Sequence, residues 1–219
     1  FSGYSDIAIG LALLMGFRLP INFNRPYLSQ TPSDFWRRWH ISLSTWLRDY
    51  LYISLGGNKG HKWLVARNLM ITMLLGGLWH GAAWNFVLWG LFHGCILVVA
   101  RNVVIESTFG FRMISKVVIN FHLVVFSWLL FRVPDMKTFT GYIEGLIEFS
   151  GTTQISALAY LILLGAFCFH VFPISIIHTK VKNAVICFPD FIQAGCYAVL
   201  VLILIGVSID AGNFIYFRF

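Results

Sequence analysis

Charged side chains are scarce in this sequence: only 11% of the residues are Asp, Glu, Lys or Arg, while 58% are hydrophobic. A typical soluble domain carries about 25% charged residues, so the composition excludes that class. The apolar residues form continuous runs and do not alternate with polar residues as they do in outer-membrane strands. The sequence therefore predicts an all-α integral membrane protein.

Several motifs of soluble enzymes are missing. The 4 cysteines form no C-x-x-C pair, and no two of the 7 histidines stand four residues apart, so a metal site has no support in the sequence. There is no G-x-S-x-G motif of a serine nucleophile, and the glycine-rich turn at 56–60 lacks the Gly-Lys-Ser/Thr ending of a phosphate-binding loop. We therefore expect no metal, no bound cofactor and no serine catalysis.

The few charges are unevenly distributed. The chain has a net charge of +7, and residues 18–67 alone hold eight Lys or Arg against Asp34 and Asp49. Basic residues beside spanning helices follow the positive-inside rule, so we expect this segment on the cytoplasmic face, in contact with membrane lipid. No recognised nucleic-acid-binding motif accompanies the basic residues, so nucleic acid is not an expected partner.

Six apolar runs are candidate membrane helices. They lie at residues 7–17, 63–78, 82–104, 117–131, 155–177 and 193–207. We interpret 1–17 as a truncated helix, 18–62 as a basic cytoplasmic segment, and 63–219 as about five membrane helices, of which the first is short enough to be re-entrant. Residues 1–219 are then the C-terminal part of one transmembrane domain of a longer, multi-pass protein.

Residues 32–52 are predicted to form one amphipathic helix. Thr31 can cap its N-terminus, Pro32 suits the first helical position, and Asp34 faces the positive end of the helix dipole. At about 100° per residue, the large apolar side chains fall within one arc and the arginines outside it. Such a helix lies in the headgroup plane. His40 falls inside the apolar arc, so we expect its ring to point at protein or lipid.

His80 is the best candidate for chemistry because it lies at the seam between two apolar runs. An ionisable side chain at membrane depth is costly and indicates a functional site. Apolar surroundings disfavour the charged imidazolium, and a neutral ring can take a proton from an attacking hydroxyl. The alternative is a core histidine satisfied by one backbone carbonyl. Trp79, Trp84 and Asn85 could orient a carbonyl or an oxyanion, although tryptophans are also common at membrane interfaces without chemistry.

At this point the residues resemble the membrane-bound O-acyltransferase family. The resemblance is carried by residues 3–10, by Asn22-Phe23-Asn24-Arg25-Pro26-Tyr27, by residues 35–53 with Trp39-His40-Ile41-Ser42-Leu43-Ser44 at their centre, by residues 75–94, and by the ending 214–219. Within the family the sequence is most similar to the bacterial branch that O-acetylates alginate. The teichoic-acid D-alanylation branch is a more distant relative.

The resemblance implies that His80 is the family's essential histidine, inside a tunnel through the membrane, and that His40 is its second conserved polar position. It also implies a multi-pass O-acyltransferase of the bacterial inner membrane. Such an enzyme moves an acetyl group from cytoplasmic acetyl-CoA toward hydroxyls of an exported polysaccharide such as alginate, directly or through an extracytoplasmic acetyltransferase partner. Lys59, Lys62 and Arg67 would then meet the CoA phosphates, unless they are only positive-inside anchors.

Two functions of other classes remain open. A transporter subunit of a polysaccharide-export system predicts further charges inside the spans and internal repeats, and the sequence contains neither. A non-catalytic membrane scaffold would only hold an extracytoplasmic transferase in place.

Overall fold

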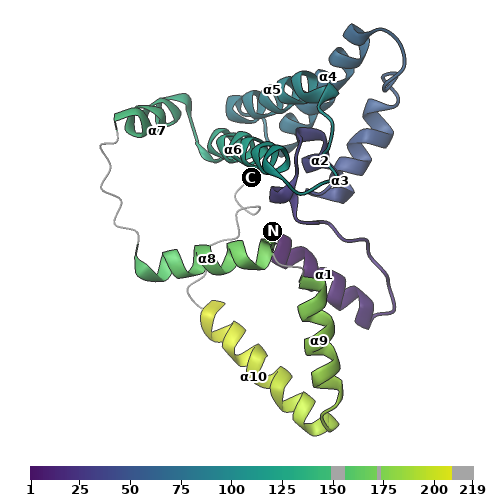
Figure 1. Cartoon of the computed structure of the whole chain (residues 1–219), viewed down its shortest axis with the longest axis vertical. Helices are drawn as coiled ribbons and strands as arrows, with labels where there is room; N and C mark the ends of the chain where they lie inside the picture. Colours follow the sequence, from purple (N-terminus) through teal and green to yellow (C-terminus); the bar gives the residue numbers. More distant parts are fainter. Residues whose placement is uncertain (149–155, 172–173, 209–219) are drawn as a thin grey trace. The chain divides into compact units, whose positions relative to one another are not determined.

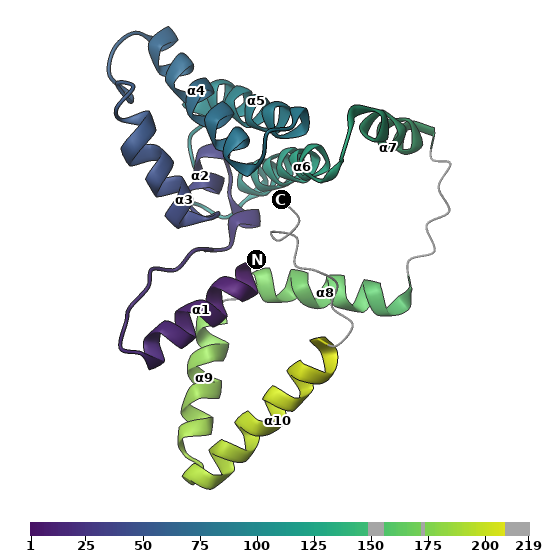
Figure 2. The same cartoon turned by 180° about the vertical axis from the view of Figure 1, so that it is seen from behind.

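The computed structural model describes residues 1–148, 156–171 and 174–208, and every regular element among them is a helix (Figures 1 and 2). The helices are α1 (Ser2–Leu14), α2 (Pro32–Trp36), α3 (Ile41–Trp46), α4 (Lys62–His80), α5 (Trp84–Val99), α6 (Phe111–Arg132), α7 (Met136–Glu148), α8 (Ala157–Val171), α9 (Ile174–Ile186) and α10 (Asp190–Ser208). Short helical turns, η1 (Pro26–Leu28), η2 (Leu47–Tyr52) and η3 (Ala100–Asn102), lie between them. The all-α prediction is confirmed, and the string at 214–219 lies outside the described residues.

The chain divides into two compact units, Phe1–Gln154 and Ile155–Phe219. All candidate site residues belong to the first unit, where α4 lies along α5 and α6 packs against α5 (Figures 1 and 2). The second unit contains α8, α9 and α10, and many of its described apolar side chains are exposed.

Two helices of the described part of the chain are long and apolar enough to cross a membrane. They are Trp84–Asn102, which is α5 with η3, and Phe111–Arg132, which is α6. Shorter apolar helices occur at Ser2–Leu14, Ala157–Cys168 and Asp190–Ile203. Helix α4 has 19 residues, but Arg67, Asn68 and Thr72 lower its hydropathy. Helices α5 and α6 therefore support a membrane protein, and the larger number of spans stays a prediction.

Glycines bring α4 and α5 into close contact. A side chain at Gly77 would overlap the carbonyl oxygen of Phe86, and a side chain at Gly90 would overlap that of Met73. Residue 77 of α4 faces residue 86 of α5, whereas the earlier residue 73 faces the later residue 90, so the two helices are antiparallel. Their backbones approach more closely than any Cβ atom would allow.

The predicted helix over 32–52 is wrong as a single element, because the chain breaks at His40. Thr31 caps α2 as expected, since its hydroxyl oxygen accepts a hydrogen bond of 3.1 Å from the Asp34 amide. Helix α2 ends at Trp36, however, and His40 adopts a left-handed conformation with φ 42° before α3 begins.

The break has a tertiary cause that the local sequence does not contain. The backbone of the preceding loop binds the chain on both sides of His40: the Asn24 amide donates to the Arg38 carbonyl at 2.8 Å, and the Ile41 amide donates to the Asn22 carbonyl at 2.9 Å. These hydrogen bonds replace those of a continuous helix. Tertiary contacts therefore outweigh helix propensity here.

We expect Gly90→Ala to destabilise the protein by about 1–3 kcal/mol, because the added methyl group forces α4 and α5 apart. Gly145→Ala in α7 is the matched control, since nothing lies within 4 Å of its new Cβ. Thermal unfolding of the two variants in detergent is the measurement. Equal melting temperatures would contradict the close packing of α4 on α5.

Candidate active site

His80 is the last residue of α4, and its half-buried ring lies in a cage of aromatic side chains. Its ring centroid is 5.0 Å from that of Phe131, 5.4 Å from Trp89 and 6.2 Å from Phe86, and it lies 4.9 Å from its neighbour Trp79. Helices α4, α5 and α6 all contribute to this aromatic cage. The structure therefore places His80 where three helices meet.

The chain turns sharply just after His80. Helix α4 ends because Gly81 is extended, with φ 161° and ψ 155°, and α5 begins at Trp84. A Cβ atom on Gly81 would come within 2.6 Å of the Phe86 ring. Glycine at this position therefore lets Phe86 close against the end of α4, which holds the imidazole at the helix terminus.

The other predicted residues near His80 take different positions. Asn85 is buried, and its side-chain amide donates to the Phe131 carbonyl at 3.4 Å, which ties the first turn of α5 to the end of α6. Asn85 thus supports the ring of Phe131, which contacts His80. Trp79 contacts the imidazole directly, whereas Trp84 is 77% exposed.

His40 is held by a network around Asn22. The Asn22 side-chain oxygen accepts from the Ser42 amide at 3.1 Å and lies 3.3 Å from Nδ1 of His40. Nδ1 also lies 3.3 Å from the Ser42 hydroxyl oxygen, so two polar groups hold the ring in place. Burial lowers the pKa of His40 below its ordinary value, so the ring is neutral at pH 7.

The two histidines belong to one neighbourhood. Both rings belong to the first compact unit of the chain. Aromatic contacts also connect them: Trp39, beside His40 in the chain, lies 4.8 Å from Trp128, and Trp128 lies 6.0 Å from Phe131 of the aromatic cage. The structure thus brings together the two histidines that the sequence singled out.

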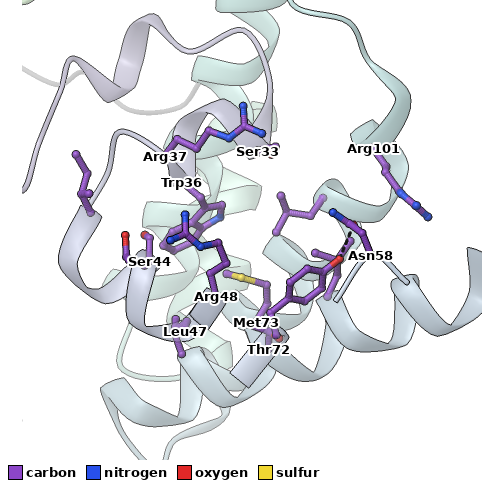
Figure 3. A pocket seen from close by; sticks show the side chains of 15 residues that line it. Ser33, Trp36, Arg37, Ser44, Leu47, Arg48, Asn58, Thr72, Met73 and Arg101 are labelled. Atoms are coloured by element: carbon purple, nitrogen blue, oxygen red, sulfur yellow. Dashed lines mark hydrogen bonds between the residues drawn. The ribbon is translucent and has the colours of Figure 1, made fainter. Parts of the chain in front are cut away.

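A cavity of about 590 Å³ lies between the 33–58 segment and helices α4 and α5. Three arginines line it, with Arg37 and Arg48 on one side and Arg101 on the other (Figure 3). The remaining lining residues are Ser33, Trp36, Ile41, Ser44, Thr45, Leu47, Tyr52, Asn58, Leu69, Thr72, Met73 and Leu97. We call this cavity the arginine pocket; its cations and hydroxyl groups suit an anionic ligand.

The arginines of this pocket are not the basic residues that the sequence analysis selected. Lys59 and Lys62 are exposed and do not line it, and Arg67 donates to the Asn68 side chain at 3.0 Å. Arg37 and Arg48 belong to the basic segment 18–67, but the break at His40 separates them, so no single helix face relates them. Arg101 joins them only through the antiparallel packing of α5.

His93 is a buried histidine that the sequence motifs did not single out. It is fully buried in α5, and its ring centroid lies 5.1 Å from that of Trp36 and 4.7 Å from that of Trp89. The sequence did contain a signal, since Trp89 and His93 stand four residues apart and therefore share a helix face.

Comparison with known proteins gives a consistent result. Residues 1–134 match the model of the membrane-bound O-acyltransferase family. The chain is 53% identical over 158 residues to the probable alginate O-acetylase AlgI of Pseudomonas aeruginosa, a match that covers 72% of this chain and 30% of that protein. It is 42% identical over 156 residues to the peptidoglycan O-acetyltransferase of Helicobacter pylori, a match that covers 70% of this chain and 30% of that protein.

A more distant relative is the teichoic acid D-alanyltransferase of Bacillus subtilis, which is 32% identical over 146 residues, 60% of this chain and 37% of that protein. The chain spans about a third of the length of these curated relatives.

The aromatic cage, the network around His40 and the arginine pocket all lie within the matched residues 1–134. The family that the sequence motifs predicted is confirmed: the chain belongs to the membrane-bound O-acyltransferase family, and within it the chain is similar to alginate O-acetylases.

Proposed function

We propose that this chain is part of a bacterial inner-membrane enzyme that transfers an acetyl group from cytoplasmic acetyl-CoA toward hydroxyl groups of an exported polysaccharide such as alginate. The acceptor receives the acetyl group directly or through an extracytoplasmic partner protein. The observation that carries the proposal is His80, a histidine held in the aromatic cage at the end of α4. The names of the relatives support O-acetyl transfer, since two of them are an alginate O-acetylase and a peptidoglycan O-acetyltransferase.

His80 acts as the general base in this mechanism. An acceptor hydroxyl attacks the thioester carbonyl while its proton moves to the neutral imidazole. The carbon–sulfur bond then breaks, and the departing thiolate takes the proton back from His80. The products are the acetyl ester and free CoA, and the imidazole is regenerated. The aromatic cage keeps water from competing with the acceptor hydroxyl.

His40 is a positioning residue in this proposal. Its Nδ1 is tied to Asn22, so its Nε2 is left available to orient the acceptor or the His80 ring.

The arginine pocket is the proposed site for the phosphates of acetyl-CoA. Arg48 forms an ion pair with Asp49 at 2.7 Å, whereas Arg37 and Arg101 form no ion pair with another described residue. Met73 of the pocket precedes His80 by seven residues on α4, a separation of about 10 Å along the helix axis. Lys59, Lys62 and Arg67 are proposed to act outside this pocket, where the donor approaches.

We expect His80→Gln to lower acetyl transfer by about 10²- to 10⁴-fold, because the proton acceptor is lost. The measurement is loss of acetyl groups from radiolabelled acetyl-CoA with purified full-length protein and the polysaccharide. His122→Gln is the control, since His122 is exposed on α6 and binds only the Val118 carbonyl in its own helix.

Full activity in a folded His80→Gln variant would contradict the catalytic assignment. Uptake of polysaccharide into vesicles without transfer would point to a transporter, and the absence of both activities in the unmodified protein would point to a scaffold.

We expect Arg37→Gln and Arg101→Gln each to raise KM for acetyl-CoA by roughly tenfold with little change in kcat, because a charge-assisted contact to phosphate is lost. Arg18→Gln is the matched control, since Arg18 is exposed in the loop after α1 and does not line the arginine pocket. Raising the salt concentration should weaken donor binding in the unmodified protein more than in these two variants. A KM that responds equally to all three substitutions would place the phosphates elsewhere.

A further inference from the structure

Helix α7 carries its apolar and its charged side chains on opposite sides. At about 100° per residue, its six large apolar side chains fall within one arc of about 140°. Its three charged side chains, those of Lys137, Glu144 and Glu148, fall within about 40° of one another outside that arc. We call the apolar arc the apolar face of α7; its residues are Met136, Phe139, Tyr142, Ile143, Leu146 and Ile147.

Most of the apolar face is exposed in the described part of the chain. The side chains of Ile147, Leu146 and Tyr142 are 74%, 65% and 56% exposed. Single exposed apolar side chains are ordinary on a protein surface, but a contiguous group of them on one helix face marks a contact surface. The apolar face of α7 is therefore a candidate for such a surface.

Helix α7 begins where a helix long enough to cross a membrane ends. Three residues separate Arg132, the last residue of α6, from α7, and Figures 1 and 2 show α7 beyond this end of α6. Val133 leaves the helical conformation, with ψ 136°, because the proline that follows it disfavours a helix. Asp135 then caps α7 by accepting a hydrogen bond of 2.7 Å from the Thr138 amide. Since three residues reach about 10 Å at most, α7 starts at the membrane boundary.

The apolar face of α7 turns back toward α6. The ring centroid of Phe139 lies 6.1 Å from that of Phe126. Phe126 precedes the end of α6 by six residues, about 9 Å along the helix axis, so this contact lies on the membrane side of the boundary. Phe126 and its neighbour Val125 are themselves exposed on α6. The exposed apolar surface of α6 therefore continues onto α7, and the charged side of α7 points away from it.

Lipid is the partner that this geometry favours. A helix with one apolar and one charged side, next to a spanning helix, is typical of the boundary between lipid headgroups and acyl chains. Tyrosine suits that boundary because its ring is apolar and its hydroxyl reaches the headgroups. A polysaccharide would need many hydrogen-bonding groups, whereas Tyr142 carries the one hydroxyl group of the apolar face.

We propose that α7 lies in the plane of the membrane surface, with its apolar face between headgroups and acyl chains and its charged residues in water. The charges assign the leaflet. Residues 132–148 carry two basic and three acidic side chains, whereas residues 101–116, which precede α6, carry three basic and one acidic. By the positive-inside rule the segment before α6 is cytoplasmic, so α7 lies on the extracytoplasmic leaflet. This placement does not depend on acetyl transfer.

A helix in this position anchors one end of the candidate site. Phe131 contacts the His80 ring at 5.0 Å and stands five residues before the start of α7. Lipid that binds α7 therefore also holds this end of α6, and with it Phe131, at a fixed depth in the membrane.

Spin labels on the full-length protein test the proposal. Its cysteines are replaced by serine, and a nitroxide is attached at Leu146→Cys or, as the matched control, at Glu144→Cys, about 160° away around α7. The protein is placed in vesicles of phosphatidylethanolamine and phosphatidylglycerol. We expect the label at 146 to collide with oxygen, which dissolves among acyl chains, and to lose its collisions with a water-soluble nickel complex. The label at 144 should show the reverse.

Two results at position 146 would overturn the proposal. Protection from both oxygen and nickel would show that protein covers the apolar face. Equal collision with nickel at 146 and 144 would show that α7 lies in water. Thermal unfolding in detergent shows whether each variant is folded, and Ile147→Cys repeats the measurement on the same face if Leu146→Cys is not.

A second measurement tests the leaflet. Spheroplasts expose only the outer side of the inner membrane, so a thiol reagent that cannot cross membranes should label Glu144→Cys in them. Labelling that appears only after the spheroplasts are broken would overturn the assignment to the extracytoplasmic leaflet.

Discussion

The close approach of α4 and α5 is the constraint on which the candidate site depends. Glycines at 77 and 90 allow backbone contact, and this contact fixes which residues of the two antiparallel helices face each other. It sets Phe86 and Trp89 beside the ring of His80 at one end of the hairpin, and it carries Arg101 to the arginine pocket at the other. Since helix packing in an apolar solvent relies on such van der Waals contact, the small residues determine the site as much as the polar ones do.

The sequence predicted the parts of this structure that depend on local pattern. Apolar runs predicted α1, α4, α5, α6 and α10 but not α7, the Thr31 cap was read correctly, and the position of His80 between two runs identified the centre of the aromatic cage. Features that depend on distant partners were not predictable in this way. Nothing in the local sequence reveals that Trp36 packs on His93. The local sequence likewise does not show that Arg101, after α5, lines the same pocket as Arg37.

The first unit contains an aromatic region around His80 and a separate pocket lined by arginines. Rings from α4, α5 and α6 surround His80, while three guanidinium groups line the arginine pocket. In the proposed function, this separation suits a donor with a charged end and a neutral reactive end. A charged group placed among the rings would lose its hydration, and a thioester placed among the arginines would meet water.

The break at His40 makes the second histidine dependent on a distant segment of chain. The side-chain oxygen of Asn22 contacts both the Ser42 amide and the His40 ring. The backbone carbonyl of Asn22 accepts a hydrogen bond from the Ile41 amide. The backbone of a histidine inside a continuous helix is held by the helix itself, whereas His40 is held by hydrogen bonds to the loop that contains Asn22. Local opening of the loop that carries Asn22 therefore releases the His40 ring and the start of α3 together, so this part of the site assembles and comes apart as one cooperative unit.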